Sequence, residues 1–179
     1  MHPDISEVVL TEEQIQKRVV EMGNQIAADY AGEEILVVSI LRGAAIFMAD
    51  LVRAIPLPLE MDFMAVSSYG SGTTSSGDVA IVKDLSTSIE GKHVLIAEDI
   101  LDTGLTLSCL IGMLKERKPA SIEIAALLKK EGTQKVDIDC KYIGFDCPDG
   151  FIVGYGLDYA EHYRNLPYIG ILKPEVYNG

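Results

Sequence analysis

The stretch that decides the fold of this chain is residues 94–107, which read VLIAEDILDTGLTL. Its first four residues form a short apolar run, which is typical of a β-strand buried on both faces. Two adjacent carboxylates, Glu98 and Asp99, follow this run, and Asp102 comes shortly after them. Beyond the Thr103-Gly104 turn, apolar residues recur at helical spacing at positions 107, 110, 111 and 114. The stretch therefore predicts a strand, a tight turn and the start of a helix.

A strand that turns into a helix start offers a binding site for phosphate. Backbone N–H groups point outward at the first turn of a helix, where the helix dipole is positive. Acidic residues beside such a site would repel the phosphate unless they hold ribose hydroxyls or a metal ion. The pattern therefore indicates a phosphorylated sugar as ligand. The alternative is an ordinary surface turn in which Asp102 or Thr103 caps the helix.

Two acids, then Asp-Thr-Gly and a closing Thr106, make residues 94–107 specific enough to compare with known families. The stretch resembles the phosphoribosyl pyrophosphate signature of the type I phosphoribosyltransferases. Some members of that family have a lysine where this chain has Leu105, so the resemblance implies a greater role here for backbone amides and hydroxyls.

Composition and charge exclude several other classes of protein. The chain has 179 residues and a formal net charge of -12, which disfavours nucleic acid as a partner because phosphate backbones need a basic surface. No apolar run approaches the roughly 20 residues of a membrane-spanning helix, so we expect no membrane partner. The 3 cysteines are an odd number without metal-type pairing, which predicts reduced thiols and a cytoplasmic protein.

Strands and helices alternate across residues 35–145. This predicts an α/β fold with a mostly parallel open sheet flanked by helices. We expect a single domain over residues 1–179, with its core at about 35–145 and a small hood from residues 1–30 and 146–179. Residues 11–30 read as a helix that begins with a capping box of Thr11 and Gln14.

Two loops follow strands of the predicted sheet. Leu41, Arg42 and Gly43 come directly after an apolar strand, and in the family this position is a short loop that handles pyrophosphate through an unusual backbone. Residues 67–77 are rich in Gly and Ser, and Ser68-Tyr69 matches the family's lid over the substrate. Arg42 could otherwise be a surface turn residue, and the second loop a flexible hairpin or linker.

The carboxyl-terminal third of the chain narrows the resemblance to one group within the family. Lys130 follows an apolar strand, where it would point into the ligand crevice of an open sheet. Residues 148–159 read PDGFIVGYGLDY and resemble the purine-binding segment of the hypoxanthine-guanine phosphoribosyltransferases. The resemblance implies transfer of a phosphoribosyl group from phosphoribosyl pyrophosphate to N9 of a 6-oxopurine, with Mg²⁺ as cofactor. It also implies a homodimer or homotetramer.

The family assigns roles to individual residues. Near the sugar, Glu98 and Asp99 would bind the ribose hydroxyls directly or through a metal ion, and Asp102 would act as general base or acid at purine N7. The 5′-phosphate would be held by Thr103, Gly104, Leu105 and Thr106. Those at the pyrophosphate would be Leu41, Arg42, Gly43 and Arg164, with Asp158 a further metal contact. At the purine, Lys130 would donate a hydrogen bond to the 6-oxygen, Phe151 would stack on the base, and the main chain of Ile152 would bond the edge of the base.

Each assignment has a simpler alternative. Lys130 could be a solvated surface lysine, Phe151 an ordinary core residue, and Asp158 the cap of the turn before Glu161. Within the same fold, the rivals are a phosphoribosyltransferase for orotate, adenine or xanthine, and a pyrimidine-operon regulator that binds RNA. A non-catalytic nucleotide-binding module would leave Asp102 and the Ser68-Tyr69 lid without a role.

Overall fold

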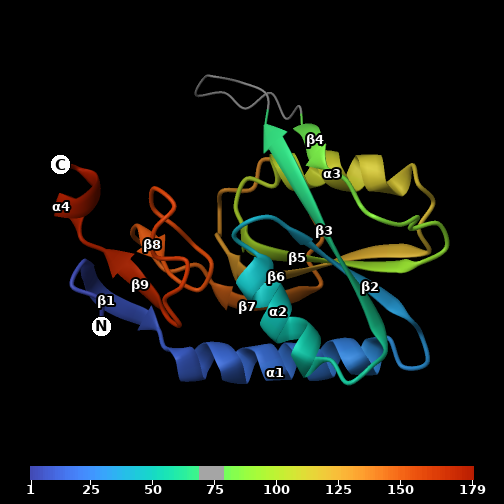
Figure 1. Ribbon diagram of the computed structural model, residues 1–179, viewed down its shortest axis with the longest axis horizontal. Coiled ribbons are helices and arrows are strands. Elements are labelled where there is room, and N and C mark those ends of the chain that lie inside the picture. Colours follow the sequence, from blue (N-terminus) through green and yellow to red (C-terminus); the bar gives the residue numbers. More distant parts are fainter. Residues whose placement is uncertain (69–78) are drawn as a thin grey trace.

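The computed structural model describes residues 1–68 and 79–179 (Figure 1). Its larger sheet has six strands in the order β4-β3-β2-β5-β6-β7. These are β2 (Ile35–Ile40), β3 (Leu59–Ser68), β4 (Val79–Lys83), β5 (His93–Leu101), β6 (Ser121–Lys129) and β7 (Tyr142–Asp146). All neighbouring pairs are parallel except β3 and β4, which are antiparallel. The predicted mostly parallel sheet is thus confirmed.

Helices cover both faces of this sheet. The face with Val37, Leu95 and Leu127 packs against α1 (Glu12–Asp29) and α2 (Ala45–Ala54). The opposite face, with Val38 and Ile96, packs against α3 (Leu105–Lys115). Because successive side chains of a strand alternate between the two faces, both sets must be apolar in a strand covered on both sides. This explains the unbroken apolar run at 94–97.

Helix α1 differs from the sequence prediction in where it packs. Its capping box is confirmed: the Gln14 N–H donates to Thr11 Oγ1 at 3.2 Å, and the Thr11 N–H donates to Gln14 Oε1 at 2.8 Å. However, Ile15, Met22 and Ile26 are fully buried in the cluster formed with α2 and the larger sheet. Residues 12–29 therefore belong to the core and not to the hood expected from residues 1–30. An apolar stripe of this length is buried only by packing against another large apolar surface.

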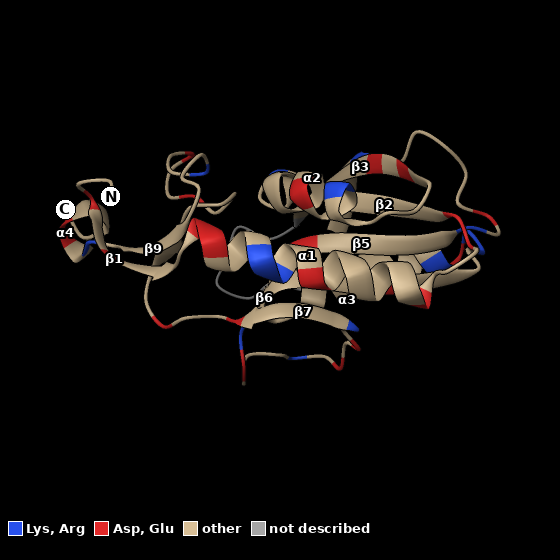
Figure 2. Cartoon of the chain, turned by 90° about the horizontal axis from the view of Figure 1, so that it is seen from below, with Lys and Arg blue, Asp and Glu red and all other residues tan. Residues whose placement is uncertain are grey.

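A second, small sheet joins the two ends of the chain. Its order is β1-β9-β8, from β1 (Ile5–Leu10), β9 (Ile169–Leu172) and β8 (Ile152–Val153), with both neighbouring pairs antiparallel. Strand β1 and the short helix α4 (Pro174–Tyr177) are missing from the sequence prediction. Figure 1 shows this sheet and both termini to one side of the larger sheet, and Figure 2 shows the same separation from below.

The two parts meet at a pair of glycines. A Cβ at Gly156 would overlap the main-chain oxygen of Gly43, so the loop after β2 lies directly against the segment after β8. The structure therefore places the β2–α2 loop beside the small sheet. Among the described residues, no helix is long and apolar enough to cross a membrane. Tyr69, predicted to form the lid with Ser68, lies outside the described residues, and Ser68 is the last residue of β3.

Candidate active site

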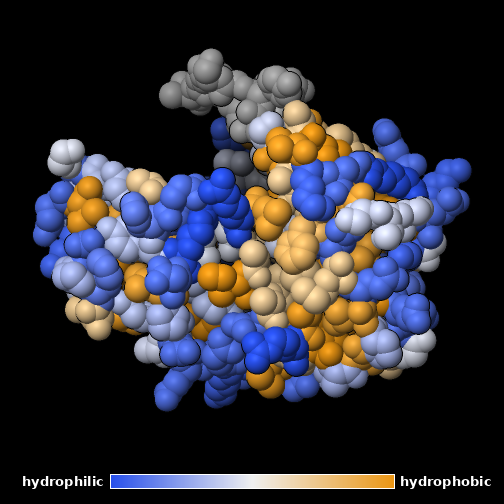
Figure 3. Space-filling view, viewed as in Figure 1, coloured by the Kyte–Doolittle hydropathy of each residue, from blue (hydrophilic) through white to orange (hydrophobic). Residues whose placement is uncertain are grey.

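Three adjoining pockets lie where β5 and β6 end. The helix-end pocket is lined by Glu98, Asp102, Thr103, Gly104 and Thr106 together with apolar side chains. The lysine pocket is lined by Asp102, Lys130, Cys147, Asp149, Ile152 and their neighbours. The aspartate pocket is lined by Asp99, Gly150, Phe151, Ile152, Leu157 and Asp158. Ile100 lines all three, so they adjoin around this residue, and together they are called the groove below. Figure 3 shows that the surface is hollowed between the part that contains the small sheet and the part that contains the larger sheet.

The helix-end pocket contains the amino terminus of α3. Gly104 precedes the helix with φ of 77°, and a Cβ there would press against the Ile138 side chain, so glycine is required on two grounds. Gly104, at the N-cap position, has no side chain to cap the helix, and the Leu105 N–H donates a long bond of 3.5 Å to Thr103 Oγ1. The capping alternative therefore holds in part for Thr103, and the following N–H groups of the first turn remain available for an anion.

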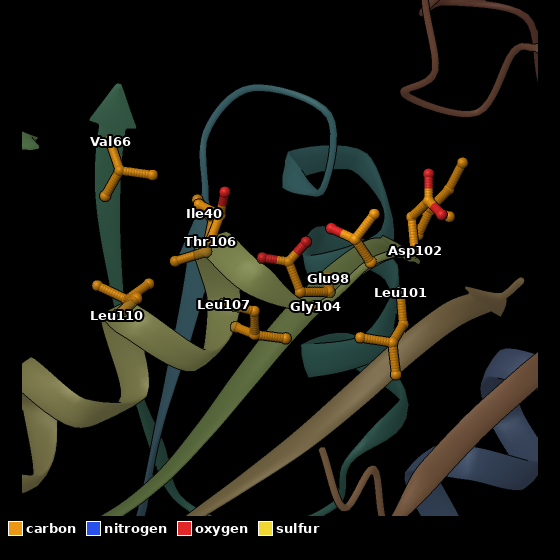
Figure 4. A pocket seen from close by; sticks show the side chains of 11 residues that line it. Ile40, Val66, Glu98, Leu101, Asp102, Gly104, Thr106, Leu107 and Leu110 are labelled. Carbon is orange, nitrogen blue, oxygen red and sulfur yellow. The ribbon is translucent and has the colours of Figure 1, made fainter. Parts of the chain in front are cut away.

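Glu98 and Asp99 enter different pockets although they are neighbours in sequence. Figure 4 shows the Glu98 carboxylate directed toward Thr106, above Leu107 and Leu110. Asp99 instead faces the aspartate pocket, where it lies against the backbone of Gly43: a Cβ on that residue would collide with the Asp99 carboxylate. Successive residues of a strand point to opposite faces, which accounts for this division. The two acids thus serve two ends of the groove.

The electrostatics of the two acids reflect their burial. Removal from water raises the pKa of Glu98 well above its usual range, and the charge of Asp99 raises it further. Burial also raises the pKa of Asp99, although the N–H of Ile100 donates to its Oδ1 at 2.7 Å and the charge of Arg164 acts in the opposite direction. Asp158 adds to the increase. Both carboxylates would therefore be stabilised by positive charge.

The loop after β2 has the unusual backbone that the resemblance implies. The peptide bond between Leu41 and Arg42 is cis. Leu41 and Arg42 are both exposed, and the Arg42 guanidinium forms an ion pair with Glu161. This ion pair connects the β2–α2 loop with the loop that precedes β9.

Arg164 is fixed from several sides. Its Nη1 donates to the main-chain oxygen of Gly156 at 2.8 Å, and its Nη2 lies 3.1 Å from Asp158 Oδ1. The Glu161 N–H donates to Asp158 Oδ2 at 2.9 Å. Asp158 thus caps the turn, as one alternative held, and also faces the aspartate pocket.

The lysine pocket brings Asp102 and Lys130 to one cavity. Lys130 is exposed, as the surface-lysine alternative expects, but its side chain lines this pocket. Its N–H donates to the main-chain oxygen of Leu101 at 2.9 Å, which joins the ends of β5 and β6. Gln134, absent from the sequence prediction, donates from its side-chain amide to the main-chain oxygens of both Asp102 and Lys130. Nothing in the local sequence around Gln134 marks this role.

Phe151 is a wall of the aspartate pocket and not a core residue. It is 39% exposed, so the core alternative is wrong. One face of its ring stacks on Tyr177 at 4.8 Å between centroids, with the edge of Tyr159 at 5.5 Å. The Phe151 main-chain oxygen accepts a bond from the Leu172 N–H at 2.7 Å. Because main-chain groups alternate along an antiparallel strand, those of the next residue, Ile152, face away from β9.

The sequence and the fold both match a known class of enzymes. Residues 7–160 match the phosphoribosyl transferase domain, and the chain belongs to this family. It is 55% identical over 177 residues to the hypoxanthine-guanine phosphoribosyltransferase of Bacillus subtilis (strain 168), covering 99% of this chain and 98% of that protein. A crystal structure of a hypoxanthine phosphoribosyltransferase from Staphylococcus aureus superimposes with a TM-score of 0.96 at 55% identity, covering 100% of this chain and 97% of that one.

A third relative is much longer. The bifunctional protein TilS/HprT of Listeria innocua is 54% identical over 178 residues. That match covers 99% of this chain, which spans only 28% of the length of that protein. The family match, the Bacillus subtilis enzyme and the Staphylococcus aureus structure together confirm the resemblance to the hypoxanthine-guanine phosphoribosyltransferases and the expected fold class.

Proposed function

We propose that this chain is a purine-salvage enzyme that transfers the 5-phosphoribosyl group of phosphoribosyl pyrophosphate to N9 of hypoxanthine or guanine. The products are IMP or GMP and pyrophosphate. The observation that carries the proposal is the set of three adjoining pockets, which offer a helix amino terminus, carboxylates and a lysine, the groups that suit a phosphorylated sugar and a purine. Identity along nearly the full length of the Bacillus subtilis enzyme supports the same reaction.

The helix-end pocket would hold the 5′-phosphate. We assign this group to the N–H groups at the start of α3 and to the hydroxyls of Thr103 and Thr106, across Gly104 and Leu105. Glu98 would then accept hydrogen bonds from the ribose hydroxyls, since its carboxylate lies beside this pocket. Hydroxyl donors favour the ionised carboxylate, which offsets the effect of its burial.

Pyrophosphate would be bound on the side of the small sheet. Arg42 and Arg164 present guanidinium groups there, and both are linked to Glu161. The backbone of Leu41, Arg42 and Gly43 would border the same ligand, because Gly43 lies against both Asp99 and Gly156. Arg164 Nε is buried and has no hydrogen-bond partner among residues 1–68 and 79–179, so it has a donor available for an anion.

The purine would occupy the space between Phe151 and Lys130. Lys130 carries only donors and suits a 6-oxygen. The free face of Phe151 would stack on the base, and the outward main-chain groups of Ile152 would bond its edge. Asp102 lines both the lysine pocket and the helix-end pocket, so it lies between the base and the sugar phosphate.

The chemistry follows from this placement. The C1′–O bond breaks and its electron pair leaves with pyrophosphate, so positive charge develops on the ribose. N9 of the base supplies the electron pair of the new C1′–N bond, and Asp102 accepts the proton from N7. The groove contributes by holding the two substrates in line and by stabilising the separated charges.

The residues present fit a magnesium ion. Asp99 and Asp158 line one pocket and repel each other, which contributes to the raised pKa of Asp99. In the described part of the chain, no three His, Cys, Asp or Glu side chains converge on a metal site. Magnesium is commonly held by one or two carboxylates together with substrate phosphate oxygens, which matches such a pair. Glu98, which enters the helix-end pocket, would hold the ribose hydroxyls. When bound, the ion would neutralise charge on pyrophosphate.

Magnesium dependence can be tested with excess chelator. We expect nucleotide formation to stop and to return when Mg²⁺ or Mn²⁺ is restored. Binding of phosphoribosyl pyrophosphate by calorimetry should show the same dependence. Full activity in chelator would contradict the role given to Asp99 and Asp158.

We also propose a cytoplasmic location and a homodimer or homotetramer. The three cysteines are free thiols, which fits a reducing compartment. Exposed apolar side chains such as Met61 and Val82 are available for contact between copies of the chain. Light scattering of the purified protein tests the assembly.

The experiment that tests the proposed function offers hypoxanthine, guanine, xanthine, adenine and orotate in turn with phosphoribosyl pyrophosphate. Pyrophosphate release and nucleotide formation are measured for each base. We expect turnover with hypoxanthine and guanine. Turnover confined to orotate or adenine, or none with any base, would contradict the proposal.

A further inference from the structure

Glu161 connects two arginines, Arg42 and Arg164, one of which also contacts Asp158 of the aspartate pocket. Its Oε2 forms the ion pair with Arg42 Nη1, and its Oε1 lies 3.5 Å from Arg164 Nη2. Arg42 belongs to the loop after β2, whereas Arg164 belongs to the loop before β9, so one carboxylate spans the two parts of the molecule. Each oxygen serves a different guanidinium, as two oxygens of a bound phosphate group would.

The position of this carboxylate is set by its backbone. Ala160 and Glu161 have φ of 51° and 68°, in the left-handed region that residues with a side chain seldom adopt. The turn is held by the Glu161 N–H, which donates to Asp158 Oδ2 at 2.9 Å. Asp158 is in turn bound to Arg164 at 3.1 Å. Glu161 is therefore directed at the arginines by a defined turn.

We propose that Glu161 is an internal competitor of pyrophosphate, which occupies the two arginines until the ligand displaces it. The inference rests on the proposed function, because it requires Arg42 and Arg164 to bind a pyrophosphoryl group. By holding both arginines, Glu161 lowers the affinity for pyrophosphate and phosphoribosyl pyrophosphate and favours release of the product. It also holds Arg42 beside Arg164 when no ligand is bound.

The exposure of the pair makes displacement feasible. The side chains of Arg42 and Glu161 are 71% and 61% exposed, and exposed ion pairs are weak. A polyanion with several charged oxygens can therefore replace a single carboxylate. Arg164, only 25% exposed, would keep its contacts with Asp158 and Gly156 while Glu161 moves away. The exchange thus needs movement of one exposed side chain.

The test measures pyrophosphate binding by calorimetry in the presence of Mg²⁺. We expect Glu161→Gln to bind pyrophosphate about three- to fivefold more tightly than the wild type, the range set by an exposed ion pair. The pyrophosphate concentration that inhibits the forward reaction should fall by the same factor. The matched control is Glu175→Gln, the same charge change at an exposed residue of α4, and it should leave the affinity unchanged.

A double-mutant cycle separates release of an arginine from a general charge effect. In an Arg42→Gln background, Glu161→Gln should lose most of its gain, because the contact it removes is already absent. An equal gain in both backgrounds, or unchanged or weaker binding in Glu161→Gln, would overturn the inference. A wild type that binds no pyrophosphate would instead overturn the proposed function itself, and the inference with it.

Discussion

Asp102 and Lys130 are tied together by one side chain: the Gln134 amide donates to the main-chain oxygen of each. The two residues come from different strand ends, β5 and β6, and both line the lysine pocket. The Lys135 N–H adds a bond of 2.9 Å to the main-chain oxygen of Thr103. The segment after β6 therefore supports the turn that carries Asp102.

Gln134→Ala should lower kcat/KM for hypoxanthine by roughly tenfold, because catalytic groups lose rate when their placement is loosened. The affinity for phosphoribosyl pyrophosphate should change much less, since most of its contacts lie elsewhere. Steady-state kinetics and calorimetry measure the two effects. Gln25→Ala, at an exposed glutamine of α1, is the control. Equal kinetics for both variants would remove Gln134 from the account.

Asp102→Asn should leave the affinity for phosphoribosyl pyrophosphate nearly intact and lower turnover by roughly 10²–10⁴-fold, as expected for a positioned acid–base group. The amide retains the size of the carboxylate but cannot accept the N7 proton. Single-turnover rates with saturating substrates test this directly. Turnover within a few-fold of the wild type would show that Asp102 is not the proton acceptor.

Glu98→Gln should stabilise the free protein while weakening substrate binding. The raised pKa of Glu98 means that the folded state binds a proton more tightly than the unfolded state. The wild type therefore loses stability as pH rises from the usual carboxyl pKa through the raised value, at about 1.4 kcal/mol for each unit of elevation. The glutamine amide of the variant does not ionise, so its stability does not fall with pH for this reason.

Urea unfolding at pH 5 and pH 8 measures this effect. The variant should gain in free energy of unfolding relative to the wild type at pH 8, and the gain should shrink at pH 5. Glu90→Gln, at an exposed glutamate before β5, should show no such gain. A Glu98→Gln variant less stable than the wild type at both pH values would mean that the carboxylate is well accommodated in the folded state.

Much of the fold was predictable because the apolar residues of the core strands, which are neighbours in sequence, indicate how those strands are buried in the folded protein. The run at 94–97 is apolar on every residue, which is typical of a strand covered on both faces. Strand β1 escaped prediction because it is short and its partner, β9, lies at the other end of the chain. The packing of α1 on the larger sheet was also missed, since an amphipathic stripe does not specify which surface covers it.

The site was predictable where a motif spans neighbouring residues. Residues 98–106 are one such motif, and the structure places them around one pocket, apart from Asp99 and Leu105. Gln134 and Tyr177 contact the candidate site through the fold alone, so their sequence neighbourhoods carry no signal. Glu161 was visible only as the residue after a possible turn at Asp158. The spacing of residues along the sequence does not predict contacts between segments that are far apart in the chain.

Lys130→Gln should reduce the preference for 6-oxopurines, because an amide can turn its acceptor toward a 6-amino group. The ratio of kcat/KM for hypoxanthine over adenine should therefore fall. Lys135→Gln, at an exposed lysine of the same connecting segment, should leave the ratio unchanged. An unchanged ratio in Lys130→Gln would exclude Lys130 from base selection but not the reaction itself.

The measurement that tests the account most directly is the ratio of kcat/KM for hypoxanthine over adenine in the wild-type protein. Adenine would place its 6-amino donors against the Lys130 donors and leave both unpaired once the bound base covers them, and sites built on a specific hydrogen bond reject such analogues by roughly 10⁴-fold. We predict a ratio of that order, with IMP and pyrophosphate formed in equal amounts. Comparable efficiencies for the two bases would contradict the assignment of this chain to 6-oxopurines.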